Sequence, residues 1–296
     1  MGPPASVARR AMAVALVAMA YWAGVARAQD EGEPALRARY AAFATAQVRD
    51  AAGQPLQIES RDESRRIMGE IYALLPYSFD AVAAALKDPA HWCEILLLHL
   101  DTKDCAVTHG ATRPVLHAGV VSHYDQPAST AYRVDFGYRL VRDSPAYIEA
   151  RLVADDGPID TTDFRIVFEA MRAADGATFA HMSYAYSYGR MSDLAVRFYL
   201  ATFGRGKVGF TVVGRGAGGG PQYIGGMRGV VERNTMRYYL AVEAWLSALG
   251  LPRDARIMAA LRNWHAAVER YPRQLRELSE RRYLDMKRRE LGLPPE

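Results

Sequence analysis

Apolar and polar residues alternate along the middle of the chain. The clearest run, 132–140, has aromatic or branched residues at every second position, with arginine, aspartate or glycine between them. A period of two is typical of a β-strand with one buried face. Similar runs follow over 148–152, 163–170 and 178–188, separated by short segments that contain proline, glycine or aspartate. Strands joined by such turns predict an antiparallel meander.

A helical period replaces this alternation after residue 226. Between Met227 and Leu249, apolar positions recur at spacings of three and four, which places them on one face of a helix. That face comprises Val231, Thr235, Tyr238, Val242, Trp245 and Leu249. Most charged residues fall away from it, namely Arg228, Glu232, Arg233, Arg237 and Glu243. We expect the apolar face to be buried, either in an ordinary core or against a curved sheet.

Shorter elements are predicted before the meander. A peripheral helix is expected within 29–55 and a strand over 65–75. A short alanine-rich helix over 80–87 follows, and Asp88-Pro89 is expected to turn the chain out of it. A further strand is predicted over 115–124.

The segment between the meander and the long helix is harder to interpret. Ser192-Asp193 can cap a helix that runs to Gly204, and 207–213 is consistent with a short strand. Residues 214–226 include seven glycines and predict a flexible loop, which we interpret as a mobile lid. After Gly250-Leu251-Pro252, a charged helical tail is expected over 254–291.

The N-terminus has the pattern of an export signal. Arg9 and Arg10 precede an apolar run over 11–25, and Ala26-Arg27-Ala28 supplies the small residues that a signal peptidase recognises. We expect cleavage near Ala28 and a periplasmic or secreted mature protein; an uncleaved anchor is the alternative. The expected division is a signal peptide over 1–28, a leader with a helix over 29–63, a main domain over 64–249 and a helical extension over 250–296.

Charge and cysteine content narrow the functional classes. The formal net charge is +4 over 296 residues, and no nucleic-acid-binding motif occurs, so no nucleic-acid partner is implied. The two cysteines, Cys93 and Cys105, are close enough in sequence to form a disulfide in an oxidising compartment. A zinc site with several cysteine ligands is then excluded. We expect no cofactor and no metal.

The order of these elements resembles the START-like superfamily of helix-grip proteins. The strand over 65–75, the Pro-x-x-Phe turn at Pro76, short helices ending in Asp88-Pro89-x-x-Trp92, the meander and the long helix carry the resemblance, which covers 64–249. It implies an α+β fold in which a curved antiparallel sheet wraps a long C-terminal helix and leaves an apolar cavity for lipids, sterols or polyketides. The segment 191–226 and the helical tail depart from the family pattern. The meander is also similar to secreted bacterial members of the superfamily to which no activity is attached.

Aromatic residues are the candidate lining of that cavity. A core filled by the same rings is the alternative, since aromatic stripes usually pack in cores. The candidates from the strands and the long helix are Tyr132, Phe136, Tyr138, Phe164, Phe168, Tyr184, Tyr186, Tyr238, Val242 and Trp245.

Catalytic and metal candidates are weaker. His181, beside Glu169 on a neighbouring predicted strand, is the candidate general base in the cavity. A Cys-His nucleophile system built from His91, Cys93, His99 and Asp101 conflicts with the expected disulfide. The acidic positions Asp155, Asp156, Asp160 and Asp163 lack the spacing of a calcium loop.

The sequence therefore favours an exported protein that binds a hydrophobic small molecule or lipid, with lipid transport as one role. A cyclase- or hydrolase-type enzyme on the same scaffold is the first alternative. The second is a scaffold protein that meets a partner, or transiently an anionic membrane surface, through its tail helix. In that helix Trp264, Val268, Tyr271 and Leu275 share one face, which could equally cover the protein's own core.

Overall fold

The structure, a computed structural model, describes residues 32–110, 112–190, 206–216 and 218–294. The chain divides into two compact units, residues 1–46 and 47–296. The described part of the first unit is helix α2 (Gly32–Ala46), in which Glu33 and Arg37 form an ion pair one turn apart. This confirms the helix expected after residue 29. None of the helices in the described residues is both long and apolar enough to cross a membrane.

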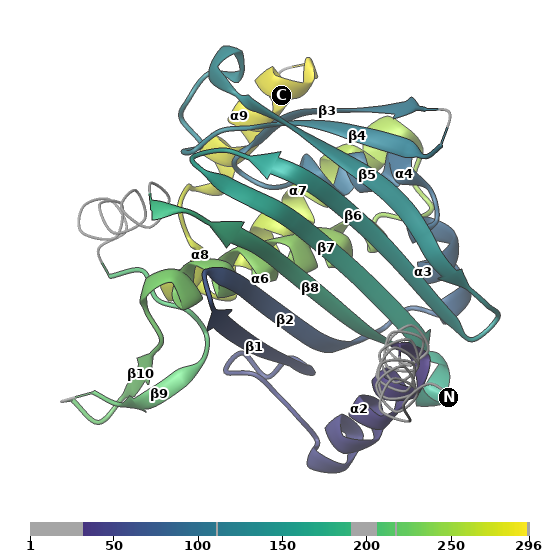
Figure 1. Cartoon of the computed structure of the whole chain (residues 1–296), viewed down its shortest axis with the longest axis vertical. Coiled ribbons are helices and arrows are strands. Elements are labelled where there is room, and N and C mark those ends of the chain that lie inside the picture. Colours follow the sequence, from purple (N-terminus) through teal and green to yellow (C-terminus); the bar gives the residue numbers. More distant parts are fainter. Residues whose placement is uncertain (1–31, 111, 191–205, 217, 295–296) are drawn as a thin grey trace, which may run out of the picture. The chain divides into compact units, whose positions relative to one another are not determined.

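Within its described residues, the second unit is built on an eight-stranded antiparallel sheet (Figure 1). The strand order is β1-β2-β8-β7-β6-β5-β4-β3. The strands are β1 (Leu56–Glu63), β2 (Arg66–Leu75), β3 (Thr102–His109), β4 (Pro114–Val120), β5 (Tyr132–Asp143), β6 (Tyr147–Gly157), β7 (Thr161–Arg172) and β8 (Thr178–Tyr188). The meander predicted from the alternating runs is confirmed as β5 to β8.

Strand β1 was not predicted from the sequence. Residues 56–63, placed in the leader, pair along their whole length with β2 through a two-residue turn at Ser64 and Arg65. The segment alternates Leu56, Ile58 and Ser60 with polar residues, and its last three positions are exposed. An edge strand needs few apolar residues because only part of one face is buried.

Two short helices connect β2 to β3. Helix α3 (Phe79–Leu86) begins at Ser78, whose hydroxyl accepts a hydrogen bond from the Ala81 amide. The chain turns out of α3 at Asp88, as expected, but a second helix, α4 (Pro89–Leu96), follows at once. It begins there because Asp88 caps it by accepting from the Ala90 amide, and proline is well suited to the first helical position.

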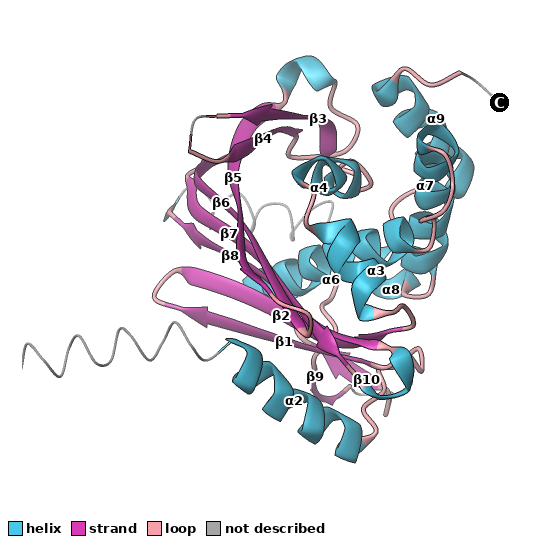
Figure 2. Ribbon diagram, turned by 90° about the vertical axis from the view of Figure 1, so that its right-hand side faces the viewer, coloured by secondary structure: helices cyan, strands magenta, loops and turns pink. Residues whose placement is uncertain are grey.

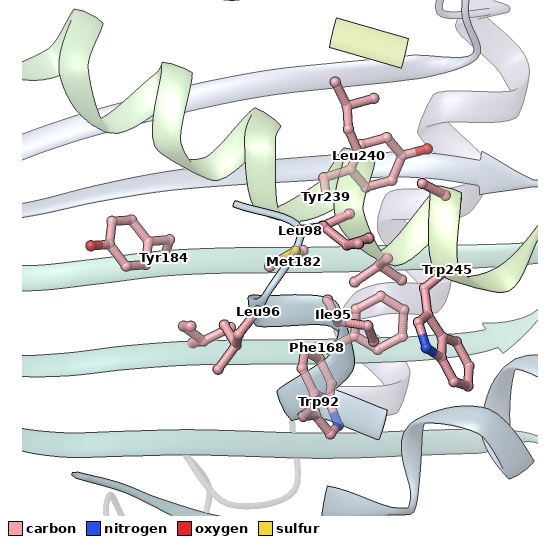
Figure 3. Packing of buried hydrophobic residues seen from close by; sticks show 14 of the residues in the cluster. Trp92, Ile95, Leu96, Leu98, Phe168, Met182, Tyr184, Tyr239, Leu240 and Trp245 are labelled. Carbon is pink, nitrogen blue, oxygen red and sulfur yellow. The ribbon is translucent and has the colours of Figure 1, made fainter. Parts of the chain in front are cut away.

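The long helix predicted over 227–249 is α6 (Gly226–Leu246), and it lies across the concave face of the sheet (Figure 2). It packs against β1, β2 and β8 at one edge of the sheet. Gly69 of β2 permits the closest approach, because a Cβ atom there would collide with Thr235 of α6. Helices α3 and α4 occupy the space beside α6 under the centre of the sheet, where Phe168, Trp92 and Trp245 form the core (Figure 3).

Three of the charged residues that fall away from the apolar face of α6 are nevertheless buried. Glu232, Arg233 and Arg237 have exposed fractions of 0%, 3% and 7%. The tail helix α7 (Arg253–Glu269) packs against α6, and Trp264 donates a hydrogen bond to the Arg237 carbonyl at 3.0 Å. The tail therefore covers the protein's own core, as one of the two alternatives for it predicted.

Two further tail helices complete this layer, α8 (Pro272–Leu275) and α9 (Glu280–Leu291). Helix α9 holds the connection between α4 and β3. Tyr283 donates a hydrogen bond to the Leu98 carbonyl and Lys287 to the Thr102 carbonyl, both at 2.7 Å.

The glycine-rich segment is more ordered than a flexible loop. Strands β9 (Val212–Arg215) and β10 (Pro221–Tyr223) form an antiparallel hairpin within it. The predicted strand over 207–213 therefore overlaps β9 only at its end. The predicted helix over 192–204 lies outside the described residues.

Candidate functional site

A cavity of about 210 Å³ lies between the sheet and the N-terminal half of α6. Helix α6 contacts β1, β2 and β8, whereas α3 contacts β7 and α4 contacts β3 and β4. The cavity walls come from the end of α4, the α4–β3 connection, the start of β3, strands β4, β5, β7 and β8, the β4–β5 connection, the β6–β7 turn and α6. They comprise Leu96, His99, Asp101, Thr102, Ala118, Val120, Val121, Ser122, Val134, Phe136, Pro158, Ile159, Thr161, Phe164, Tyr184, Tyr186, Met227, Asn234 and Tyr238.

Aromatic rings from three strands and the helix meet in this cavity. Phe164 of β7 stacks on Tyr186 of β8, with ring centroids 5.2 Å apart and planes inclined by 16°. Tyr184 lies 5.3 Å from Tyr238 of α6, and Phe136 of β5 adds a fifth ring. Burial raises the pKa of each of the three tyrosines above its ordinary value, so their hydroxyls stay neutral at physiological pH.

His99 is the most deeply buried titratable side chain in the wall, with an exposed fraction of 4%. Its Nδ1 accepts a hydrogen bond from the Asp101 amide at 3.2 Å, and its ring stacks on Tyr238 at 4.8 Å. Its Nε2 is buried and has no hydrogen-bond partner among the described residues. Burial lowers the pKa of His99 well below its usual value, and the positive charges of Arg237 and Lys287 lower it further. The ring is therefore neutral.

A second, more polar cavity of about 580 Å³ adjoins the first. Asp101, Ser122, Ile159 and Asn234 contribute to the walls of both. Arg237 lines only the second cavity and forms an ion pair with Glu277 at 2.9 Å. The apolar cavity thus shares part of its wall with one that carries more charged residues, and ligand cavities commonly combine apolar walls with a few polar groups.

The structure brings together half of the predicted cavity residues. Phe136, Phe164, Tyr184, Tyr186 and Tyr238 line the cavity. The others do not, although Tyr132, Tyr138, Phe168, Val242 and Trp245 were expected to.

The residues that line the cavity differ from those that do not in their position along the strand or helix. Tyr132 lies at the start of β5 and is 42% exposed. Tyr138, on the same face of that strand, instead donates hydrogen bonds to the Leu86 and Lys87 carbonyls at the end of α3. Phe168 packs edge-to-face on Trp92, and Trp245 donates to the Glu94 carboxylate at 3.0 Å. Val242 is fully buried one turn before Trp245. Except for the exposed Tyr132, these residues fill the core beside α3 and α4 rather than the cavity.

The predicted general base His181 lies on the opposite face of the sheet. Tyr184 and Tyr186 line the cavity, and residues an odd number of positions away on β8 point to the other face. There His181 Nδ1 lies 2.6 Å from Glu169 Oε2, and its ring stacks on Tyr72 at 4.5 Å. The proximity to Glu169 was predicted correctly, but a base on this face has no access to the cavity.

The Cys-His nucleophile arrangement is absent because Cys93 and Cys105 form the predicted disulfide, with Cα atoms 5.4 Å apart. The bond closes the loop that carries Leu96, His99, Asp101 and Thr102 into the cavity wall. The disulfide thus holds part of the cavity wall, and its two cysteines are not free nucleophiles.

Metal ligation has no geometric support in the described residues, where no group of three or more histidine, cysteine, aspartate or glutamate side chains could hold an ion. Of the acidic positions considered for calcium, Asp163 forms ion pairs with Arg66 and Arg165. Asp160 lies in the β6–β7 turn with Ile159, and both residues have positive φ angles, of 57° and 54° respectively.

Several wall residues were not predicted as part of a cavity. His99 and Asp101 were considered only for a nucleophile system, whereas Asn234 and Met227 were not considered for the site. Asn234 lies four residues before Tyr238, one turn away on the helix, so helical spacing could have identified it. No comparable signal marks the α4–β3 connection, because its path across the cavity depends on tertiary packing.

Comparison with known proteins gives a fold-level result. No protein-family model and no curated protein sequence matches this chain. Similar solved structures include human StAR-related lipid transfer protein 5, at 11% identity and a TM-score of 0.34 over 58% of this chain and 91% of that one. Norcoclaurine synthase from Thalictrum flavum matches at 10% identity and a TM-score of 0.32 over 48% and 82% of the two chains. A protein from Arthrobacter aurescens matches at 15% identity and a TM-score of 0.34 over 67% and 94%.

The helix-grip α+β fold itself is seen directly in the strand order and in the place of α6 on the concave face. At these identities and TM-scores the matches carry no argument about ligand or activity, which must come from the cavity.

Proposed function

We propose that this protein binds a hydrophobic small molecule or lipid in the cavity under β4, β5, β7 and β8. The convergence of five aromatic rings from the sheet and α6 on one space carries the proposal. Apolar and aromatic walls with few polar groups are the usual composition of a small-molecule site, because burial of apolar ligand surface supplies most of the binding free energy.

The wall shared with the second, more charged cavity supports an amphipathic guest. An apolar body would occupy the aromatic chamber, and polar atoms would lie towards Ser122 and Asn234, which belong to both walls. Transport of such a guest between membranes is part of the proposal. A cyclase- or hydrolase-type activity is not, because its candidate base His181 lies on the other face of the sheet.

Native mass spectrometry of protein purified from its own host is the first test. A stoichiometric adduct that is released on denaturation and identified as a lipid or apolar metabolite would support the proposal. Protein that carries no adduct and takes up no member of a panel of fatty acids, sterols and aromatic polyketides would contradict it.

A matched pair of variants locates the binding. Phe136→Leu and Phe168→Leu make the same change on neighbouring parts of the sheet, but only Phe136 lines the cavity, whereas Phe168 packs on Trp92 in the core. We expect Phe136→Leu to change the affinity for a bound probe more than stability. Phe168→Leu should lower stability and leave affinity nearly unchanged. The reverse pattern would place the binding elsewhere.

Export is a further part of the proposal. The signal-like N-terminus and the Cys93–Cys105 disulfide both support a periplasmic or secreted location, since structural disulfides persist in oxidising compartments. Fractionation of the host followed by N-terminal sequencing tests it. A chain recovered from the cytoplasm with residues 1–28 intact would contradict it.

A further inference from the structure

One buried hydrogen-bond donor in the cavity wall is left without a protein partner in the described residues. His99 Nε2 is buried, and the histidine side chain is 5% exposed. A buried polar group without a partner is costly, so a ligand atom that satisfies it gains more than a contact at the surface would give.

The other ring nitrogen determines which atom carries the proton. Nδ1 lies 3.2 Å from the backbone amide of Asp101, and an amide can only donate. Nδ1 must therefore be the acceptor, which places the hydrogen of the neutral ring on Nε2. The ring is also held in place by stacking on Tyr238. His99, a residue of the cavity wall, thus carries an N–H donor on Nε2 in one tautomer and one ring orientation.

The surroundings of this donor discriminate between charged and uncharged acceptors. The described wall of the aromatic cavity contains no lysine and no arginine, and its ionisable acid is Asp101, whose side chain lies 3.9 Å from His99 Nδ1. An anionic head group there would have to be desolvated and would lie near the Asp101 carboxyl group, and both are unfavourable. A carbonyl or hydroxyl oxygen avoids both costs.

We propose that the cavity selects a compact apolar ligand bearing an uncharged acceptor oxygen, a carbonyl or hydroxyl, that takes a hydrogen bond from His99 Nε2. The ligand's rings pack on Phe136, Phe164 and Tyr184, and its oxygen lies against the α4–β3 connection. This inference rests on the proposed function and specifies the ligand class for the same cavity.

The test compares two probes of equal size that differ in one group. Acetylnaphthalene has a carbonyl where ethylnaphthalene, substituted at the same ring position, has a methylene. We expect the wild-type protein to bind the ketone about threefold to tenfold more tightly in a calorimetric titration, the usual effect of one neutral hydrogen bond. Naphthoate, with an anionic carboxylate in the same place, should bind more weakly than the ketone.

Variants at His99 link the preference to this residue. His99→Phe keeps a ring to stack on Tyr238 but has no donor, so the ratio of the two affinities should fall to about one. His99→Gln keeps an amide N–H near the same position and should restore part of the preference. His91→Phe is the matched control, because the His91 ring lies against Trp245 outside the cavity wall and its loss should leave the ratio unchanged.

A measurement on the unaltered protein keeps the test decisive if His99→Phe does not fold. The histidine ring nitrogens, followed by NMR, should show a shift of His99 Nε2 with the ketone and a much smaller one with ethylnaphthalene. Equal affinities in the wild type, an unchanged ratio in His99→Phe or tight naphthoate binding would each overturn the inference while the cavity still binds. Binding of neither naphthalene would overturn it too, and the ligand panel above would then show whether the proposed function falls with it.

Discussion

Thr235 of α6 packs directly onto Gly69 of β2, at a position where any Cβ atom on residue 69 would collide with the threonine side chain. Thr235 is fully buried, and its hydroxyl donates to the Val231 carbonyl at 2.8 Å, so it has little freedom to move away. The contact fixes the height of α6 above the sheet and therefore the depth of the cavity beside it.

Gly69→Ala should consequently destabilise the protein by about 1–3 kcal/mol, the usual cost of overpacking a tight core contact. Chemical denaturation measures the loss. The double variant Gly69→Ala, Thr235→Ala should recover part of it, because the second change removes the atoms that collide. If the double variant loses as much stability as the two single variants together, the two residues do not interact as described.

Glu232 provides a second attachment of α6, and it holds the segment before the β9–β10 hairpin. Its buried carboxylate accepts hydrogen bonds from the Phe210 and Thr211 amides at 2.6 and 2.9 Å, and from the Ser60 hydroxyl at 2.6 Å. Glu232→Gln replaces one acceptor oxygen by an NH₂ group that faces donors. We expect a loss of about 2–3 kcal/mol, because hydrogen bonds to a charged group are the strong ones.

Hydrogen exchange at the Phe210 and Thr211 amides should accelerate in the same variant. Glu243→Gln is the control, since Glu243 lies on the same helix but pairs with Arg270 in a partly exposed position. That change should cost about 1 kcal/mol or less. Equal losses for the two variants would mean that Glu232 does not hold the segment.

The burial of Glu232 could not be predicted from the sequence. The spacing of Val231 and Thr235 identified the sheet-facing side of α6 correctly, because the helical period is a local property. The pattern placed the charged residues away from that side, but it does not reveal whether further elements cover them. Helix α7 packs on α6, the Ser60 hydroxyl and the Phe210 and Thr211 amides bind the Glu232 carboxylate, and Arg237 pairs with Glu277.

The site was predictable only in part for a related reason. A period of two assigns Phe136 and Tyr138 to the same face, but it does not say where along the strand a helix fills the space. Helix α3 reaches Tyr138 and leaves Phe136 to the cavity. The error on His181 was avoidable, because Tyr184 and Tyr186 had been assigned to the cavity and alternation puts His181 on the opposite face.

His181 should make stability fall between neutral and alkaline pH. Burial alone would lower its pKa, but the hydrogen bond to Glu169 and the charge of Glu70, 3.3 Å away, raise it to about 9. A folded-state pKa above the unfolded value of about 6.5 contributes stability that is fully present below pH 6.5 and is lost as the pH rises through about 9.

The size of this contribution is on the order of 1–3 kcal/mol. Denaturation of the wild type and of His181→Gln at pH values from 6 to 10 measures it as the difference between the two curves. The difference is needed because Lys287, whose pKa burial lowers to about 8, acts in the opposite direction above that pH. Glu169→Gln should reduce the effect of pH as well. Parallel curves for wild type and His181→Gln would contradict the assignment.

The Cys93–Cys105 disulfide should support ligand binding as well as stability. The bond closes a short loop, with a sequence separation of 12, and this loop brings His99 and Asp101 into the cavity wall. We expect the double variant Cys93→Ser, Cys105→Ser to lose about 2–3 kcal/mol of stability, chiefly because its unfolded chain is less restricted. The affinity for a cavity probe should fall in addition, since the loop gains freedom that binding must remove.

Reductant provides the control for this prediction. It should weaken probe binding by the wild type and leave the serine variant unchanged, because that variant has no bond to reduce. A stability loss with unaltered affinity would mean that the disulfide is not needed to hold the loop. The hydrogen bonds from Tyr283 and Lys287 of α9 to the Leu98 and Thr102 carbonyls would then suffice. Tyr283→Phe in the serine background separates the two supports, because it removes one of those bonds at the same loop.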